Sequence, residues 1–429
     1  MRFIHAADIH LDSPLKGLSL HEGAPENEIR GAVRRAFTNL IAACCQERVD
    51  FLLLAGDLYD GHWQDFNTGL FFVRQMAILR EAGIRAFFVR GNHDAENRHL
   101  TPDLPLPDNV HLFAADGPES RILEDLGVAI HGQSFSRSNQ KENLADGYPP
   151  ALPGLCNLGL LHTALSGRKG HEPYAPCQVS DLTAKGYDYW ALGHVHGREV
   201  VREDPGIHFP GNLQGRHIRE SGAKGALLVE LEPGKRPEVR FLPLDVLRWE
   251  MLSLPTPPRS AGLPVLEEGI HAALTGALAR AEGRFLVVRA IIPREDFSAP
   301  GNAGERWLPR VRALAADVAG ERIWVERVVA VETRETGCTM SPGSPLAPPD
   351  EAAGSLLDDL CGGLVTDPEV TAHLREELKE KLRALPVEIT QGEEGLRLDD
   401  EVWLGELLDR ARRLIQRELA VPAQTEQTE

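Results

Sequence analysis

Short apolar runs separated by polar turns recur through residues 1–243 and predict a strand-rich domain. Two longer stretches, at about 27–48 and 67–83, show helical spacing instead and lie between early apolar runs. Because strand, helix and strand alternate there, the sequence predicts an α/β domain that starts with βαβ units and continues with antiparallel strands. The expected strands are 2–7, 51–55, 85–90, 110–113, 127–132, 156–162, 188–193, 199–203, 207–210, 224–232 and 236–242.

Two proline-rich stretches interrupt the later part of the chain and predict linkers, at 252–264 and 341–354. Between them, helical and strand patterns alternate twice, which predicts a small α+β capping domain. Beyond the second linker, helices are expected near 367–384 and 400–419, and the latter has one apolar face for its own protein or a partner. The expected domains are 1–245, 265–335 and a C-terminal helical segment at 350–420.

The composition is that of an ordinary globular protein, with 429 residues, 42% hydrophobic and 26% charged. The chain has no signal peptide and no apolar run near the ~18 residues of a membrane span, so we expect a cytoplasmic protein with no membrane partner. The six cysteines lack CxxC spacing and are expected to be free thiols. The net charge of −18 argues against coating nucleic acid by bulk electrostatics, but it allows a local basic groove or a cationic metal site.

Five short segments place Asp, His or Asn where predicted strands end. They are ADIHL with Asp8 and His10, GDLYD with Asp57 and Asp60, GNHD with Asn92, His93 and Asp94, LLHTA with His162, and GHVH with His194 and His196. A single His at a strand end is more often structural than functional. Five such segments in one chain are hard to explain as coincidence, and loops at the carboxyl ends of strands converge on one crevice.

These residue types fit a two-metal site. Carboxylate oxygen, amide oxygen and imidazole nitrogen suit manganese, iron or zinc, and no cysteine is involved. Two cations about 3.5–4 Å apart need a bridging ligand, which the two oxygens of a carboxylate can provide. Such a pair activates water and neutralises charge on a phosphoryl group, while an imidazole can protonate the leaving oxygen. The sequence therefore predicts metal-assisted hydrolysis of a phosphate ester.

The set DxH, GDxxD, GNHD, a lone His after an apolar strand and GHxH resembles the signature of the calcineurin-like metallophosphoesterases. The resemblance implies a two-layer β-sandwich flanked by helices, with two divalent metal ions. It implies two ligand groups that share a bridging residue: Asp8, His10, Asp57 and His196 for one metal, and Asp57, Asn92, His162 and His194 for the other. It also implies that His93 is the transition-state-stabilising acid and that Asp94 is the carboxylate that orients it.

Within that superfamily, the chain is most similar to the DNA-repair nucleases. The opening MRFIHAADIHLDSPLKGL resembles SbcD-type nucleases, and FPGNLQGRHIRESGAKGALLVEL at 209–231 resembles the bacterial YhaO-type subfamily. Gly61 and Asp94 stand where serine/threonine phosphatases have Arg and Glu, and Asp60 stands where purple acid phosphatases have a metal-binding Tyr. The resemblance implies a manganese-dependent DNA exonuclease for DNA repair, a homodimer formed through the helix at 67–83, and an SMC-like ATPase partner bound by the C-terminal helices.

The motif GRHIRE adds Arg216, His217 and Arg219 as candidates for binding substrate phosphates, because arginine offers bidentate donors that match phosphate. The alternative is a solvated turn, or pairing with Glu220. Two other functions also stay open at this point. One is a small-molecule phosphodiesterase or phosphatase, and the other is a scaffold subunit of an SMC-like ATPase complex whose metals are structural.

Overall fold

The computed structural model describes residues 1–13, 15, 26–29, 31–60, 66–96, 106–165, 174–254, 262–293 and 303–331. All of these residues belong to one compact unit, Met1–Arg334. The linker expected at 341–354 and the helices expected near 367–384 and 400–419 lie outside the described residues. Every helix within the described ranges is too short or too polar to cross a membrane.

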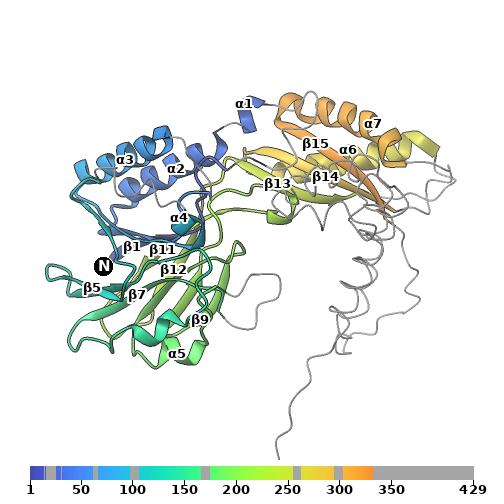
Figure 1. The fold of residues 1–429 in the computed structure, drawn as a ribbon. Helices are drawn as coiled ribbons and strands as arrows, with labels where there is room; N and C mark the ends of the chain where they lie inside the picture. The colour runs from blue at the N-terminus through green and yellow to red at the C-terminus, as the bar shows by residue number, and fades with distance from the viewer. Residues whose placement is uncertain are drawn as a thin grey trace, which may run out of the picture. The chain divides into compact units, whose positions relative to one another are not determined.

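Two six-stranded sheets pack face to face as a β-sandwich (Figure 1). The first sheet has the order β12-β11-β1-β2-β3-β4, with β1 (Arg2–Ala6), β2 (Phe51–Ala55), β3 (Arg85–Val89), β4 (Val110–Leu112), β11 (Gly225–Glu230) and β12 (Glu238–Pro243). The second has the order β5-β6-β7-β8-β10-β9, with β5 (Glu119–Leu123), β6 (Val128–Gly132), β7 (Cys156–His162), β8 (Tyr189–Gly193), β9 (Glu199–Glu203) and β10 (Gly206–Phe209). This mixed α/β sandwich confirms the expected fold class.

Alternation along the central strands explains why they are continuous apolar runs. In β2, Phe51 and Leu53 face the second sheet, whereas Leu52 and Leu54 face the helices α2 (Ala32–Glu47) and α3 (Phe66–Glu81) on the outer surface. Each fully buried side chain of this size contributes roughly 1.5–3 kcal/mol to folding. A strand buried on both faces therefore needs apolar residues at successive positions.

Within the sandwich and its helices, the structure differs locally from the sequence prediction. The helix expected at 27–48 is divided into α1 (Glu26–Ile29) and α2, because Gly31 between them has a left-handed backbone with φ of 72°. Strand β5 was not expected, since its sequence ESRIL buries little more than Leu123 at the edge of its sheet. The remaining short helices are α4 (Asn92–Glu96), η1 (Leu144–Gly147), α5 (Val179–Thr183), η2 (Ile218–Glu220) and η5 (Gly320–Arg322).

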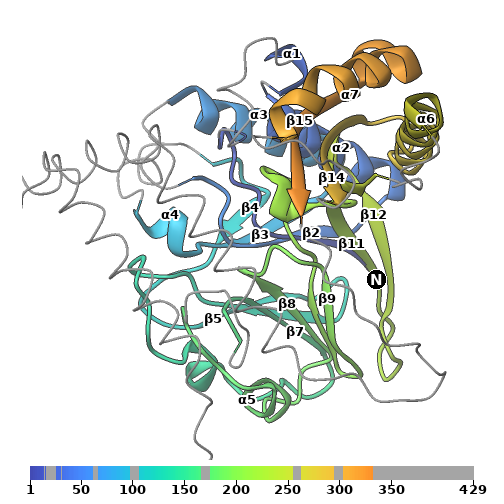
Figure 2. The same ribbon diagram turned by 90° about the vertical axis from the view of Figure 1, so that its right-hand side faces the viewer.

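A third sheet of three parallel strands follows the sandwich: β13 (Leu247–Ser253), β14 (Phe285–Pro293) and β15 (Ile323–Val331). Helices α6 (Gly262–Arg280) and α7 (Ala303–Ala319) pack on this sheet through a core of their own (Figure 2). Strand β13 was not expected, although LRWEMLS alternates apolar and charged residues over its first five positions, a pattern typical of a half-buried strand. Trp249 of this strand donates a hydrogen bond from Nε1 to the carbonyl of Gly215, next to the candidate residue Arg216.

Candidate metal centre and its pocket

All five strand-end segments meet at one end of the sandwich. Strands β1, β2 and β3 are parallel neighbours in the first sheet, and β7 and β8 are parallel neighbours in the second. Two hydrogen bonds join the sheets there: His162 Nδ1 to the carbonyl oxygen of Ala55, at 2.9 Å, and the backbone N–H of His194 to Asp8 Oδ1, at 3.0 Å. The convergence expected from the sequence therefore draws on two sheets.

Strained backbone conformations gather at this end of the sandwich. The φ angles of Asp8, His10, Asp57 and His194 are 51°, 48°, 52° and 106°, in the left-handed region that residues with a side chain rarely occupy. Each such residue costs roughly 1–3 kcal/mol unless its surroundings enforce it. Strain at four of the candidate metal ligands indicates that the surrounding packing holds their backbone in these conformations and so directs their side chains inward.

Two glycines in the motifs are required for space. A Cβ atom on Gly56 would lie 2.4 Å from His162 Nδ1, and a Cβ atom on Gly91 would lie 2.2 Å from Asp57 Oδ1. Both distances are far below van der Waals contact, so any side chain at these positions would displace a candidate ligand. The glycines of GDLYD and GNHD thus allow the loops to approach each other closely.

We call Asp8, His10 and His196 the first donor set, because their ligand atoms all lie within 4.8 Å of one another. The Nε2 atoms of His10 and His196 are 3.3 Å apart. His196 Nδ1 lies 2.7 Å from Glu220 Oε1, and His10 Nδ1 lies 3.4 Å from Asp60 Oδ1. Since a carboxylate accepts a hydrogen bond, the ring proton of His196 belongs on Nδ1, and the nearby Asp60 carboxylate favours the same tautomer of His10. Both Nε2 lone pairs then face each other, an arrangement that a cation between them stabilises.

We call Asp57, Asn92 and His162 the second donor set. The Ala55 carbonyl can only accept a hydrogen bond, so His162 carries its proton on Nδ1 and a lone pair on Nε2. That Nε2 atom lies 3.1 Å from Asn92 Oδ1 and 3.5 Å from Asp57 Oδ2. Three acceptors therefore converge, which again fits a divalent cation. Asp57 Oδ2 is also 3.9 Å from Nε2 of His10, so Asp57 lies between the two sets.

Burial raises the pKa values of the carboxylates and lowers those of the histidines, so it favours the uncharged form of each group. Burial raises the pKa of Asp8 to about 6, and burial together with Asp94 and Asp8 raises the pKa of Asp57 well above its usual value. Burial likewise lowers the pKa values of His10 and His162 well below normal. Bound divalent cations would reverse the carboxylate shifts, because metal ligands must be deprotonated.

His93, the candidate acid, is the second residue of α4 and is half-exposed. Its Nδ1 atom lies 3.3 Å from Asp60 Oδ1. Burial alone would raise the pKa of Asp60, but contacts with His10 and nearby Arg216 hold that pKa well below its usual range. Asp60 is therefore a stable anion next to His93. It is the second Asp of GDLYD, and sequence reasoning gave it no role.

Asp94 occupies a different position. Its buried carboxylate accepts hydrogen bonds from the backbone N–H groups of Leu58, Tyr59 and Gly91, at 3.2, 2.9 and 3.0 Å. These bonds tie the GDLYD loop to the GNHD loop. The orienting role expected for Asp94 stays a prediction, and the observed contacts favour a structural contribution.

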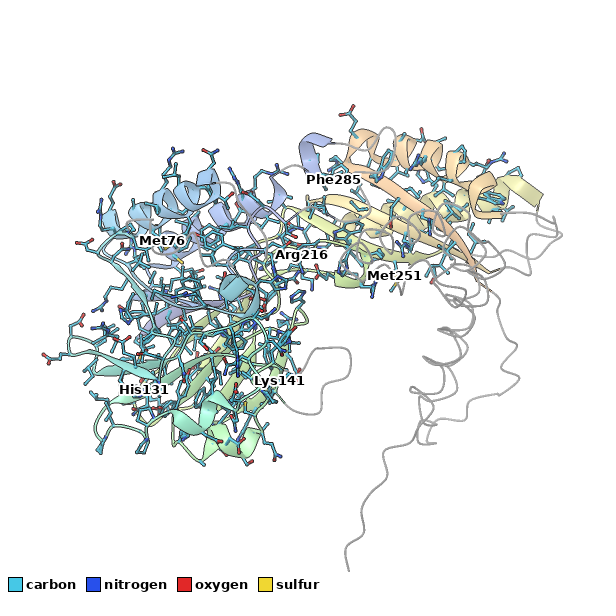
Figure 3. All side chains as sticks on the ribbon, in the orientation of Figure 1. Met76, His131, Lys141, Arg216, Met251 and Phe285 are labelled. Carbon is cyan, nitrogen blue, oxygen red and sulfur yellow. The ribbon has the colours of Figure 1, made fainter. Side chains whose placement is uncertain are left out.

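A pocket of about 680 Å³ opens above the donor sets. Arg216, His217, Arg219 and Lys224 contribute to its wall, and Arg216 lies where the sandwich adjoins β13 (Figure 3). Arg216 is mostly buried, and its guanidinium lies 3.8 Å from Asp60 and 3.5 Å from Glu220. The structure thus shows the pairing with Glu220 and places the same arginine in the wall of the pocket, while its binding of phosphate stays a prediction.

Five other candidates line this pocket: Asp57, Asn92, His93, His194 and His196. The other four, Asp8, His10, His162 and Asp94, are buried and are not part of its lining. The lining also contains Tyr174, Gly197, Ser221 and Lys224, which sequence reasoning did not consider, and Glu220, which it considered only as a pairing partner for GRHIRE. Glu220 could have been suspected from its place in GRHIRE, but no local pattern marks its contact with His196.

Comparisons with known proteins agree with this geometry. The model of the calcineurin-like phosphoesterase family matches residues 1–198. The uncharacterized metallophosphoesterase YhaO of Bacillus subtilis is 40% identical over 238 residues, which are 54% of this chain and 58% of that protein. The DNA double-strand break repair protein Mre11 of Sulfurisphaera tokodaii is 27% identical over 267 residues, 59% of this chain and 66% of that protein. The chain thus spans less than two thirds of each relative.

Two solved structures align with 56% of this chain and with 98% of their own chains. They are a dimetal phosphatase from Danio rerio, with 11% identity and a TM-score of 0.34, and the protein TT1561 of Thermus thermophilus, with 13% identity and a TM-score of 0.33.

Proposed function

We propose, from the match of residues 1–198 to the calcineurin-like phosphoesterase family, that the chain is a metal-dependent nuclease that hydrolyses phosphodiester bonds in DNA. The observation that carries the proposal is the convergence of two adjoining donor sets beneath a pocket with a cationic wall. The similarity to proteins named for DNA double-strand break repair favours DNA as the substrate and repair as the setting.

In this proposal each donor set binds one divalent cation. Asp57 belongs to both, His196 completes the first with Asp8 and His10, and His194 joins Asn92 and His162 in the second. When bound, two such cations supply a nucleophile at neutral pH and neutralise charge on the phosphoryl group. Mn²⁺ is our expectation, and the mixed oxygen and nitrogen donors also suit iron or zinc.

His93 is the proposed general acid. Because its Nδ1 atom lies next to Asp60, we assign its Nε2 atom as the one that faces the substrate. From there it would deliver a proton to the leaving alkoxide. Asp60 would hold the ring in orientation and favour its protonated form, because the carboxylate is anionic. This assignment moves to Asp60 the role that the family resemblance had implied for Asp94.

Arg216, His217 and Arg219 are the proposed phosphate-binding residues. Arg216 is held in place by Glu220 and by Ser13, whose Oγ atom lies 3.3 Å from Nη1. A guanidinium fixed in this way can bind a phosphate oxygen without losing further side-chain freedom. The two arginines give a local basic surface to a chain whose net charge is −18.

We also propose how the protein assembles with a second copy and with a partner. A homodimer would use α3, on which Ile78 is 43% exposed. An SMC-like ATPase would bind the C-terminal segment at 350–420. Deletion of residues 341–429 should abolish that binding while metal-dependent cleavage persists, and retained binding would move the partner surface elsewhere.

The direct test measures exonuclease and single-strand endonuclease activity on linear and circular DNA with Mn²⁺. We expect cleavage by the wild-type protein and loss of turnover in His93→Ala with both metal ions retained. Cyclic nucleotides and an aryl phosphate are assayed in parallel. Turnover of these small esters without DNA cleavage would establish the small-molecule enzyme, and no turnover of any substrate by the metal-loaded protein would favour the scaffold.

A further inference from the structure

A buried carboxylate lies directly behind the first donor set. Glu220 is in the short 3-10 helix η2 (Ile218–Glu220), in the loop between β10 and β11, and its side chain is 5% exposed. Its Oε1 atom lies 2.7 Å from His196 Nδ1. Glu220 therefore contacts the side of the ring opposite to the Nε2 atom that points to His10.

This contact determines which nitrogen of His196 can bind a cation. A carboxylate accepts the Nδ1 proton, so the lone pair of His196 is on Nε2 and the ring is held against rotation. The second donor set is fixed independently, because His162 donates its Nδ1 proton to the carbonyl of Ala55. A change at Glu220 should therefore affect one donor set and spare the other.

Glu220 is itself held rigidly. Its Oε2 atom accepts hydrogen bonds from Asn212 Nδ2, at 2.9 Å, and from the backbone N–H of Arg216, at 2.7 Å. The surrounding loop is joined to β13, since Trp249 donates from Nε1 to the carbonyl of Gly215 and accepts at its own carbonyl from the N–H of Gly222. A residue that orients another needs such support, because a mobile carboxylate would not restrict the imidazole.

We propose that Glu220 is the positioning residue of the first donor set and controls the affinity of that set for its cation separately from the second. The inference rests on the proposed metal centre, but it makes a claim about metal affinity rather than about DNA. In this role Glu220 does not bind the ion. It fixes the tautomer and direction of His196 and, through the backbone of Arg216, the neighbouring phosphate-binding side chain.

The test compares Mn²⁺ binding to full-length wild-type protein, Glu220→Ala and Glu220→Gln by calorimetry and by metal analysis after dialysis. In Glu220→Ala we expect the dissociation constant of one ion to rise roughly 10–100-fold while that of the other ion is unchanged. The electron paramagnetic resonance spectrum should then change, at limiting Mn²⁺, from that of a coupled pair to that of an isolated ion. Glu220→Gln keeps an acceptor oxygen for His196 Nδ1, so it should recover most of the lost affinity.

Glu326→Gln is the matched control. Glu326 is a similarly buried carboxylate, paired with Arg289 at 2.7 Å in the three-stranded sheet, away from both donor sets. It should lose stability but keep both ions. The proposal is overturned if Glu220→Ala binds both ions as tightly as the wild type, if both ions are weakened equally, or if Glu326→Gln shows the same selective loss.

Metal binding also separates this proposal from the proposed function. A wild-type protein that binds two ions but cuts no DNA would contradict the nuclease assignment and leave the role of Glu220 to be decided by the variants. A wild-type protein that binds no pair of ions would overturn both. Should Glu220→Ala fail to fold, Glu220→Gln decides the question, because the loss of charge alone should produce a smaller change in the same single ion.

Discussion

Asp60 Oδ1 lies 3.3 Å from Nδ1 of His93, across the two loops that follow β2 and β3. The same carboxylate oxygen lies 3.4 Å from His10 Nδ1, in the first donor set. One anion thus adjoins both the proposed acid and a proposed metal ligand.

Asp60→Asn should lower kcat for DNA cleavage by about 10²-fold, because an amide cannot stabilise the imidazolium that delivers the proton. The Mn²⁺ content should stay near two ions per chain, which separates this effect from damage to the first donor set. Measurement of kcat and metal content on the same preparation checks the prediction. Unchanged turnover would remove Asp60 from the mechanism.

Asp94→Ala should act on stability instead. The change leaves three backbone N–H groups without their acceptor, and each unsatisfied buried donor costs about 1–3 kcal/mol. Urea unfolding should therefore show a large drop in the free energy of unfolding. A variant as stable as the wild type but inactive would instead support the direct action of Asp94 on His93.

Removal of the metal should destabilise the protein, since the buried carboxylates Asp8 and Asp57 then face each other without a cation. A cation at 100 times its dissociation constant adds about 2.7 kcal/mol to the free energy of unfolding. We expect EDTA to lower Tm and Mn²⁺ to restore it.

Asp57→Asn should remove most of that response and yet raise the Tm of the metal-free protein, because it deletes a carboxylate whose charge is opposed by burial and by Asp94 and Asp8. Asp125→Asn, at an exposed carboxylate paired with Arg85, is the control and should behave like the wild type. A metal-free Asp57→Asn protein less stable than the wild type would contradict this account of the centre.

Acid should destabilise the sandwich through two histidines outside the metal centre. Burial lowers the pKa of His5 to about 3 and that of His208 to about 4, from 6.5. Both are neutral when folded, so below about pH 6.5 the unfolded chain binds more protons and the free energy of unfolding falls. Each histidine contributes about 1.4 kcal/mol per pH unit down to its folded pKa.

His208→Phe should preserve the stacking on Tyr189, whose ring centroid is 5.3 Å away, and remove one titrating group. The difference in stability between variant and wild type, from urea unfolding at several pH values, should then change by about 1.4 kcal/mol per pH unit between about pH 4 and 6.5. Parallel pH profiles for the two proteins would show that His208 does not titrate in this way.

Local patterns in the sequence identified most of the strands, with β5 and β13 as exceptions, and the order of the chemical motifs along them. Continuous runs such as FLLLA at 51–55 are local signals, because a strand buried on both faces must be apolar at every position. GDLYD and GNHD could be placed at strand ends for the same reason. The sequence also indicated that Gly91 is needed for a turn. The structure adds a second reason, because a side chain at this position would overlap with Asp57.

Which groups meet depends on how the two sheets and their loops pack together. The donor sets draw on two sheets, and the contact between His162 and Ala55 depends on how those sheets pack. The same is true of Asp60 beside His93 and of Glu220 behind His196, which are pairs of residues on different loops. Periodicity reports only on the environment of each residue along its own strand or helix, so the pairing of loops becomes visible once the core has fixed the distances between them.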